Sequence, residues 1–429
     1  MSGSSAGPRG GDLRNYAVVT GAYWADTIAD GAIRVLVLFH FHELGYSPLA
    51  VASLFLFYEA FGMATNLVGG YLGARLGLKV TLVAGLGAQL AALAMLALVP
   101  ASWLVVAYVM VAQALSGIAK DLTKMSSKSA VRLVADDAPG ALYRWVSVLT
   151  GSKNALKGVG FFAGGLLLST IGFRSALLVL AALVATALAG TLVLMRGDLG
   201  RPDAKARFGQ MFSHRRSVNV LAAARIFLFA ARDVWFVVAL PVFLRTELGW
   251  TFWQVGGFLA VWVIGYGIVQ ASAPRFVRGR DGAADPDGRT AVRLAFALAL
   301  LPAGIAAALL GDVEPTVALV GGLIVFGVVF AANSAVHSFL ILAYADGDRV
   351  AMNVGFYYMA NAAGRLGGTI LSGALYQWQG LQACLWASAA FVLAAGALSR
   401  MLPSAPAHGI GDPRPSAAGP PVGARQGSS

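Results

Sequence analysis

Long runs of apolar residues alternate with short polar stretches along the chain, except at its two ends. An apolar stretch of about 20 residues is long enough to cross the hydrocarbon core of a bilayer as a helix. The pattern therefore predicts an all-α membrane protein with twelve transmembrane helices. Their expected ranges are 16–42, 48–72, 79–98, 102–131, 141–171, 175–195, 218–245, 251–276, 290–310, 315–344, 350–376 and 381–401.

The longest connection between these helices, 196–217, separates them into two groups of six. We expect a cytoplasmic tail over 1–15, a six-helix bundle over 16–195, a cytoplasmic linker over 196–217, a second bundle over 218–402 and a disordered cytoplasmic tail over 403–429. The last segment is rich in Pro, Gly, Ala and Ser, a composition typical of disorder. The polar N-terminal residues carry no pattern of a cleavable signal peptide.

Arginine and lysine are concentrated on one side of the predicted helices. The even-numbered connections and the tails carry most of them, whereas the other side carries only Arg174 and Arg245. Positively charged loops stay on the cytoplasmic side of a membrane. Both termini are therefore expected in the cytoplasm.

Composition supports the membrane assignment and excludes several functions. The chain is 58% hydrophobic and 12% charged, against roughly a quarter charged in soluble proteins. Its net charge of +12 is explained by loop topology, so no nucleic-acid partner is expected. Cys384 is the only cysteine, which excludes an intramolecular disulfide and a thiol site for a soft metal. We find no metal-ligand cluster, nucleophile motif or nucleotide loop, and therefore expect no cofactor and no enzyme; a receptor or enzyme is the weakest alternative.

Two segments in the predicted halves resemble each other. "ELGYSPLAVASLF" begins at Glu43 and "ELGWTFWQVGGFL" begins at Glu247, 204 residues later. A parallel repeat of six helices is the architecture of the major facilitator superfamily. The segment "GGYLGARLGLK" at 69–79 resembles the loop signature of that superfamily, except that Ala74 replaces its usual acid. The resemblance implies the major facilitator fold in two six-helix halves.

Charged and polar side chains within the predicted helices form the candidate site. Such residues are costly in a bilayer, and they line cavities or pair with one another. The candidate substrate-binding residues are Arg34, Lys120, Lys124, Lys153, Lys157, Arg225, Arg232, Arg365, Asn333 and His337. The candidate proton-coupling or charge-balancing residues are Asp26, Asp30, Glu59, Asp121 and Asp233. Cations exceed acids by three, a surplus that suits a polyanionic ligand.

Several of these residues also have a structural interpretation. Lys120, Lys124 and Lys128 recur every four residues and share one helix face. Lys128 is better explained as an anchor at the membrane surface, and for Lys124 the two explanations are balanced. The pair Lys153 and Lys157 is the hardest to explain structurally, because no acid accompanies it in sequence.

Pairing within single helices is a further structural interpretation. Asp30 and Arg34 are one turn apart and are expected to neutralise each other. Adjacent Arg232 and Asp233 are expected to point to different helix faces and not to pair. We expect His337 to be a hydrogen-bonded packing residue more readily than a proton carrier.

The stretch "GFFAGG" at Gly160–Gly165 contains small residues that allow close helix packing. It also resembles the antiporter motif of the superfamily, but Phe161 stands where that motif has proline. A packing seam is the favoured interpretation.

Longer stretches carry a narrower resemblance. They are "FHELGYSPLAVASLFLFYE", "TNLVGGYLGARLGL", "AQALSGIAKDLTKMSSKSA", "YRWVSVLTGSKNALKGVGFF", "ARDVWFVVALPVFL" and "QVGGFLAVWVIGYG". Over nearly all of residues 15–402 the chain is similar to the ArsJ-type organoarsenical efflux permeases.

That resemblance implies export of 1-arseno-3-phosphoglycerate, conferring arsenate resistance. It also implies a functional partner, the glyceraldehyde-3-phosphate dehydrogenase that makes this compound, and a place in the bacterial inner membrane. We expect a monomer. The lack of a cysteine cluster agrees with pentavalent arsenic and argues against arsenite.

The resulting hypothesis is alternating access, in which two halves rock around a central anion site. Asp26, Asp30 or Glu59 would carry a coupling proton, while export down the substrate gradient needs none. The alternative function is a general exporter of sugar phosphates or other small organic anions.

Overall fold

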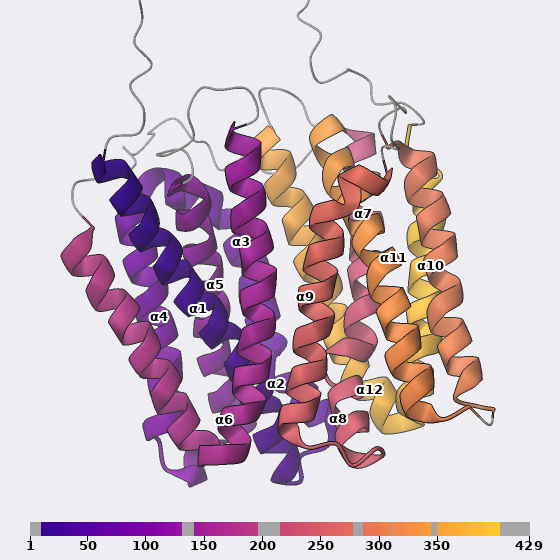
Figure 1. The fold of residues 1–429 in the computed structure, drawn as a ribbon, viewed down its shortest axis with the longest axis horizontal. Coiled ribbons are helices and arrows are strands. Elements are labelled where there is room, and N and C mark those ends of the chain that lie inside the picture. The colour runs from indigo at the N-terminus through magenta and orange to yellow at the C-terminus, as the bar shows by residue number, and fades with distance from the viewer. Residues whose placement is uncertain are drawn as a thin grey trace, which may run out of the picture.

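The computed structural model describes residues 10–130, 141–195, 215–277, 286–311, 313–344 and 350–403, and these residues form helices and turns without a strand. The helices lie side by side as one bundle (Figure 1). Their bounds are α1 Gly10–Glu43, α2 Pro48–Leu54, α3 Leu56–Leu76, α4 Leu78–Leu98, the 3-10 helix η1 Ala101–Trp103, α5 Val106–Ala130, α6 Ala141–Leu194, α7 Arg216–Phe236, α8 Ala239–Thr246, α9 Phe252–Val277, α10 Gly288–Ala308, α11 Pro315–Tyr344 and α12 Val350–Ser399.

The all-helical membrane fold predicted from the sequence is confirmed. Within the described residues, eight helical stretches are long and apolar enough to cross a membrane. Two of them, Ser152–Leu194 and Phe356–Ser399, each contain two predicted spans. Because α2 with α3 and α7 with α8 each match one predicted span, the count of twelve is consistent with the observed segments.

Four glycines with positive φ divide the helices at related positions. Gly45 follows α1 with a φ of 87°, and Gly249 follows α8 with a φ of 67°. Gly172 and Gly380 kink α6 and α12 with φ values of 76° and 73°. Left-handed backbone favours glycine because a Cβ atom would clash. The first pair lies in the repeated segments found in the sequence, and the second pair extends the same repeat.

The connection after the second predicted span is shorter than expected. The helix α3 continues to Leu76 and α4 begins at Leu78, so only Gly77 separates them. Lys79 donates a hydrogen bond to the carbonyl oxygen of Met195 at 3.1 Å, which ties α4 to the end of α6. The side chains of Ala74 and Lys128 lie outside the described residues, as do the tails 1–9 and 404–429 and most of the linker 196–217.

The "GFFAGG" stretch is a packing seam, as predicted. A Cβ atom on Gly164 would lie 3.0 Å from the Cα atom of Ala32 on α1. On the opposite side of α6, a Cβ atom on Gly256 of α9 would lie 2.7 Å from the carbonyl oxygen of Phe161. The small residues thus allow α6 to pack closely against both α1 and α9. Since α9 belongs to the second predicted half, this packing joins the two halves.

The end of the bundle that carries α2 and α8 is closed by polar contacts between the predicted halves. Arg245 forms an ion pair with Glu43 at 3.2 Å. The backbone N–H of Leu49 donates to the side-chain oxygen of Gln377 at 3.2 Å. The start of α1 and the last turns of α12 lie at the other end (Figure 1).

Candidate functional site

A chain of buried ion pairs crosses the middle of the bundle. Glu59 on α3 is 1% exposed and bonds both Arg34 on α1 and Arg365 on α12, the latter at 2.5 Å. Arg365 also contacts Asp233 on α7 at 3.3 Å, and Asp233 pairs with Arg232 at 2.5 Å. Three guanidinium groups therefore share two carboxylates across the boundary of the predicted halves.

A second group joins α1, α3 and α6. The ammonium group of Lys157 lies 3.1 Å from the carboxylate of Asp30. The hydroxyl of Tyr58 donates to the other oxygen of Asp30. The ring of Tyr58 also lies 4.1 Å from the guanidinium of Arg34. Tyr58 thus connects this group to the central chain of ion pairs by a cation–π contact.

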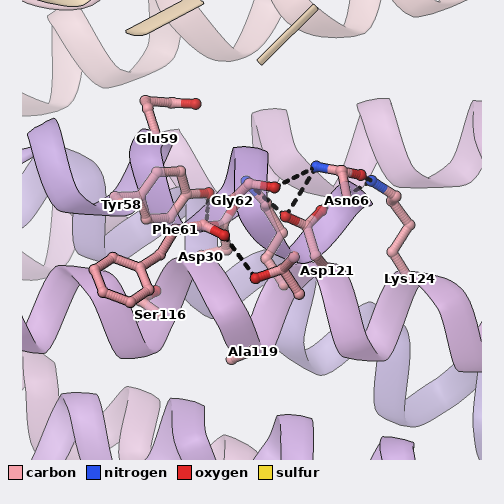
Figure 2. A network of polar contacts seen from close by, with 12 residues as sticks. Asp30, Tyr58, Glu59, Phe61, Gly62, Asn66, Ser116, Ala119, Asp121 and Lys124 are labelled. Atoms are coloured by element: carbon pink, nitrogen blue, oxygen red, sulfur yellow. Dashed lines mark hydrogen bonds and ion pairs between the residues drawn. The ribbon is translucent and has the colours of Figure 1, made fainter. Parts of the chain in front are cut away.

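A third group lies along α5 and α3. Asp121 accepts from Lys124 at 2.8 Å and lies 3.9 Å from Lys120. Figure 2 shows Asn66 beside Asp121 and Lys124, and its amide donates to Asp121 at 3.1 Å while its oxygen accepts from Lys124 at 2.6 Å. Lys120 points over the ring of Tyr58 at 4.2 Å. Two ammonium groups share one carboxylate here.

Asp26 differs from the other acids. It is 1% exposed, and one carboxylate oxygen accepts from the hydroxyl of Thr123 at 2.6 Å. The other oxygen has no hydrogen-bond partner, and no cation of the described segments lies within ion-pair distance of either. Asp26 is therefore a buried acid without a counter-ion among those segments.

Arg225 is the corresponding buried cation. Its side chain on α7 donates to the carbonyl oxygen of Ser334 on α11 at 3.2 Å and stacks over Phe229 at 4.1 Å. On α11, Asn333 and His337 are 0% and 1% exposed, and their side-chain nitrogen and oxygen atoms have no partner in the described segments. This group contains no acid.

The structure changes three expectations about pairing. Asp30 and Arg34 do not form a direct ion pair, because each has a closer partner on another helix. Arg232 and Asp233 do pair, contrary to prediction, because the long arginine side chain folds back onto its neighbour. His337 packs without a hydrogen bond to a described residue.

Three residues of these groups were missed in the sequence. Tyr58, Asn66 and Thr123 each bond a candidate acid directly. Two of them could have been found from their neighbours in sequence, because Tyr58 directly precedes the candidate Glu59 and Thr123 directly precedes the candidate Lys124. Lys153 lies on α6 and takes part in a contact with its surroundings.

A small cavity lies between the central ion pairs and the end that carries Glu43. Its volume is about 30 Å³, room for roughly two water molecules. Arg34 is its charged residue, and the remaining lining is apolar, so this cavity is too small for an organic substrate. The lining residues are Arg34, Val35, Leu38, Phe39, Phe55, Phe161, Phe236, Val237, Pro241 and Leu259.

The buried cations and acids described above are suited to binding a charged ligand. Among the described residues, no three His, Cys, Asp or Glu side chains gather in a way that could hold a metal ion. The cations outnumber the carboxylates that they share. A guanidinium or ammonium group can therefore bind an anionic ligand in place of a shared carboxylate.

Comparisons with known proteins agree with this architecture. A human protein whose crystal structure is titled organic anion transporter MFSD10 (TETRAN) superposes with a TM-score of 0.62 at 15% identity, over 90% of this chain and 99% of the other. A mutant form of the nucleoside transporter NupG superposes with a TM-score of 0.69 at 14% identity, over 91% of this chain and 99% of the other. At such low identity, these similarities establish the fold.

A search of curated protein sequences finds no match. Residues 19–284, more than half of the chain, match the sequence profile described as Major Facilitator Superfamily. The chain therefore belongs to the major facilitator superfamily and is a multi-pass membrane transporter.

Proposed function

We propose that this transporter exports a small organic polyanion by alternating access. The observation that carries the proposal is the sharing of acids among cations. Glu59 serves two arginines, Asp121 serves two lysines, and Asp233 serves two arginines. Each shared carboxylate leaves its cations with unused donor capacity.

The energetics of burial favour an anionic cargo. A buried charge is costly unless it is paired and hydrogen-bonded. Three shared acids cannot satisfy the cations around them and also Arg225, which pairs with no acid of the described residues. A drug exporter would instead favour an apolar cavity with acids. An arriving polyanion would complete the coordination of these side chains.

The substrate itself is proposed from the resemblance to ArsJ-type permeases. We propose 1-arseno-3-phosphoglycerate, with arsenate resistance as the result of its export. This compound has anionic groups at both ends, which agrees with cations distributed over several helices. The proposed binding residues are Arg34, Lys120, Lys124, Lys153, Lys157, Arg225, Arg232, Arg365, Asn333 and His337.

Resistance of cells provides the direct test. The permease and a glyceraldehyde-3-phosphate dehydrogenase are expressed separately and together in an arsenate-sensitive bacterium. We expect resistance and loss of cellular arsenic only when both are present, because the dehydrogenase makes the cargo. Resistance with the permease alone would refute this substrate.

A general exporter of sugar phosphates is the second candidate. The same cations would hold a phosphate group, and nothing in their arrangement requires arsenic. Uptake of labelled 3-phosphoglycerate or a hexose phosphate into everted vesicles would decide between the two. Competition of these compounds with the arsenical at equal concentration would favour the broader function.

Orientation and location complete the proposal. We propose a monomer in the bacterial inner membrane with both termini in the cytoplasm, following the loop charges. A reporter that fluoresces only in the cytoplasm, fused after Ser429, should be bright. Fusion of a periplasmically active phosphatase at the same position should be inactive, and activity there would reverse the orientation.

A further inference from the structure

We infer that Arg225, Asn333 and His337 form a separate subsite for a tetrahedral oxyanion, distinct from the central ion pairs. The inference rests on the proposed function, because it assigns one end of the polyanion to a specific group of side chains. The class of ligand group is a phosphate or a chemically equivalent arsenate.

The first step is the charge of Arg225. Its side chain is 3% exposed, and its Nε atom has no hydrogen-bond partner in the described part of the chain. The nearest acid on the same helix, Asp233, is held by Arg232 and Arg365. The guanidinium therefore has an unused donor in a buried environment, an arrangement that an anion would stabilise.

The second step is the pair on α11. Asn333 and His337 are four residues apart and therefore share one helix face. Both side chains are fully buried, with every polar atom unpartnered among the described segments. Arg225 bonds the carbonyl of the intervening Ser334 and acts electrostatically on the His337 ring. The helices α7 and α11 therefore meet where Arg225 bonds Ser334.

The third step is the match of donors to ligand. A guanidinium edge, an amide NH2 and an imidazole N–H are all donors suited to the oxygens of a tetrahedral anion. The ring centroids of Phe229 and Tyr357 lie 4.1 Å and 4.9 Å from the central carbon of the guanidinium. No carboxylate of the described residues competes for these donors. The subsite is therefore preset for an anion, in contrast to the central groups.

The position of the sole cysteine allows a direct binding assay. Cys384 is 0% exposed and is the only cysteine in the chain. A thiol-reactive dye therefore reports unfolding of the full-length protein in detergent. Inorganic phosphate and 3-phosphoglycerate serve as probes, and glycerate, which lacks phosphate, serves as the control. We expect the first two to raise the unfolding temperature and glycerate to have little effect.

Two variants separate binding from structure. Arg225→Lys removes the forked donor but keeps the charge, and should weaken phosphate binding roughly 10-fold or more. Asn333→Asp adds a carboxylate on the α11 face that also carries His337, and should abolish the response to phosphate because it repels the anion. Arg400→Lys is the matched control, since Arg400 also stacks on a ring, that of Phe296 at 4.9 Å, outside the proposed subsite.

The outcomes are distinct. Retained phosphate affinity in both Arg225→Lys and Asn333→Asp would overturn the subsite, whatever the effect on stability. Absence of any phosphate response in the wild-type protein would overturn it as well. If phosphate binds as expected but cells gain no arsenate resistance, the arsenical substrate fails and the subsite stands. If Arg225→Lys unfolds, loss of binding in a folded Asn333→Asp protein still tests the proposal.

Discussion

The guanidinium of Arg365 donates to the carboxylate of Glu59 at 2.5 Å, which joins α12 to α3 across the middle of the bundle. The same oxygen of Glu59 also accepts from Arg34 on α1. One carboxylate thus links the two predicted halves at the point around which they would move. We expect rocking of the halves to keep or exchange this contact according to its distance from the pivot.

Replacing Glu59 tests the importance of that carboxylate. In Glu59→Gln, two buried arginines lose their shared counter-ion, a change that costs about 3–5 kcal/mol when a buried pair is broken. We expect a lower unfolding temperature, followed through dye reaction at Cys384, and loss of transport. The double variant Glu59→Gln with Arg365→Gln should regain part of the stability. A single variant as stable as wild type would contradict the role of Glu59 as a shared counter-ion.

The Lys157–Asp30 pair provides a test of charge sign. Lys157→Glu would place two carboxylates together, so we expect both low stability and no transport. The exchange Asp30→Lys with Lys157→Asp restores opposite charges and should recover folding. Because the cation then sits on the wrong helix, transport should stay impaired. Full transport in the exchanged variant would show that only the pair, and not the position of Lys157, matters.

Asp26 is the acid we propose for proton coupling. It has Thr123 as its only hydrogen-bond donor among the described residues, and the charged groups that act on it are Asp30, Lys120 and Asp121. Its carboxylate has no ion-pair partner among the described residues, so protonation breaks none of the described ion pairs. In everted vesicles, we expect Asp26→Asn to exchange substrate normally but to ignore an imposed pH gradient. If the wild-type protein ignores the gradient as well, the transporter is a uniporter and the coupling proposal fails.

The glycine at the kink of α6 allows a test of the backbone conformation. Gly172→Ala places a side chain on backbone with a φ of 76°, and should cost about 1–3 kcal/mol. Gly190 lies in the same helix, with no atom within 4 Å of an added Cβ. Gly190→Ala should instead stabilise the helix by about 0.5–1 kcal/mol. Equal unfolding temperatures for the two variants would contradict the assigned backbone conformation.

The closed end of the bundle can be locked chemically. The backbone nitrogen of Leu49 and the side-chain oxygen of Gln377 are 3.2 Å apart, and the two residues belong to different predicted halves. A variant with Leu49→Cys and Gln377→Cys, in a Cys384→Ser background, should therefore be cross-linked by a short, reducible bifunctional reagent. Alternating access requires this end to open, and we therefore expect transport to stop and to return after reduction. Leu49→Cys alone is the control. Continued transport by fully cross-linked protein would exclude opening at this end.

The helices could be predicted from sequence because hydrophobic length and residue type are local properties. The repeated segment at Glu43 and Glu247 likewise anticipated the matching turns at Gly45 and Gly249. The predicted end of the second span at residue 72 was too early, because the helix continues through Arg75 and Leu76 to Gly77.

Pairing between helices could not be predicted in the same way. It depends on helix rotation and on the reach of flexible side chains, and neither is encoded in residue spacing. Asp30 and Arg34 have the spacing of an ion pair, yet Lys157 and Glu59 compete successfully for them. Arg232 and Asp233 have the wrong spacing, yet the arginine is long enough to fold back.

The shared carboxylates also bear on how tightly a cargo can be held. An anion that displaced Glu59 from Arg34 and Arg365 would replace bonds that the protein already makes with itself, so this part of the binding energy would be only the difference between two anionic partners of the same arginines. In the proposed cycle, the carboxylate of Glu59 would take the place of the departing cargo, so the two guanidinium groups would keep a counter-ion. In the mechanism we propose, this exchange would favour turnover over retention, because the acidic side chains of the carrier would replace the departing anion.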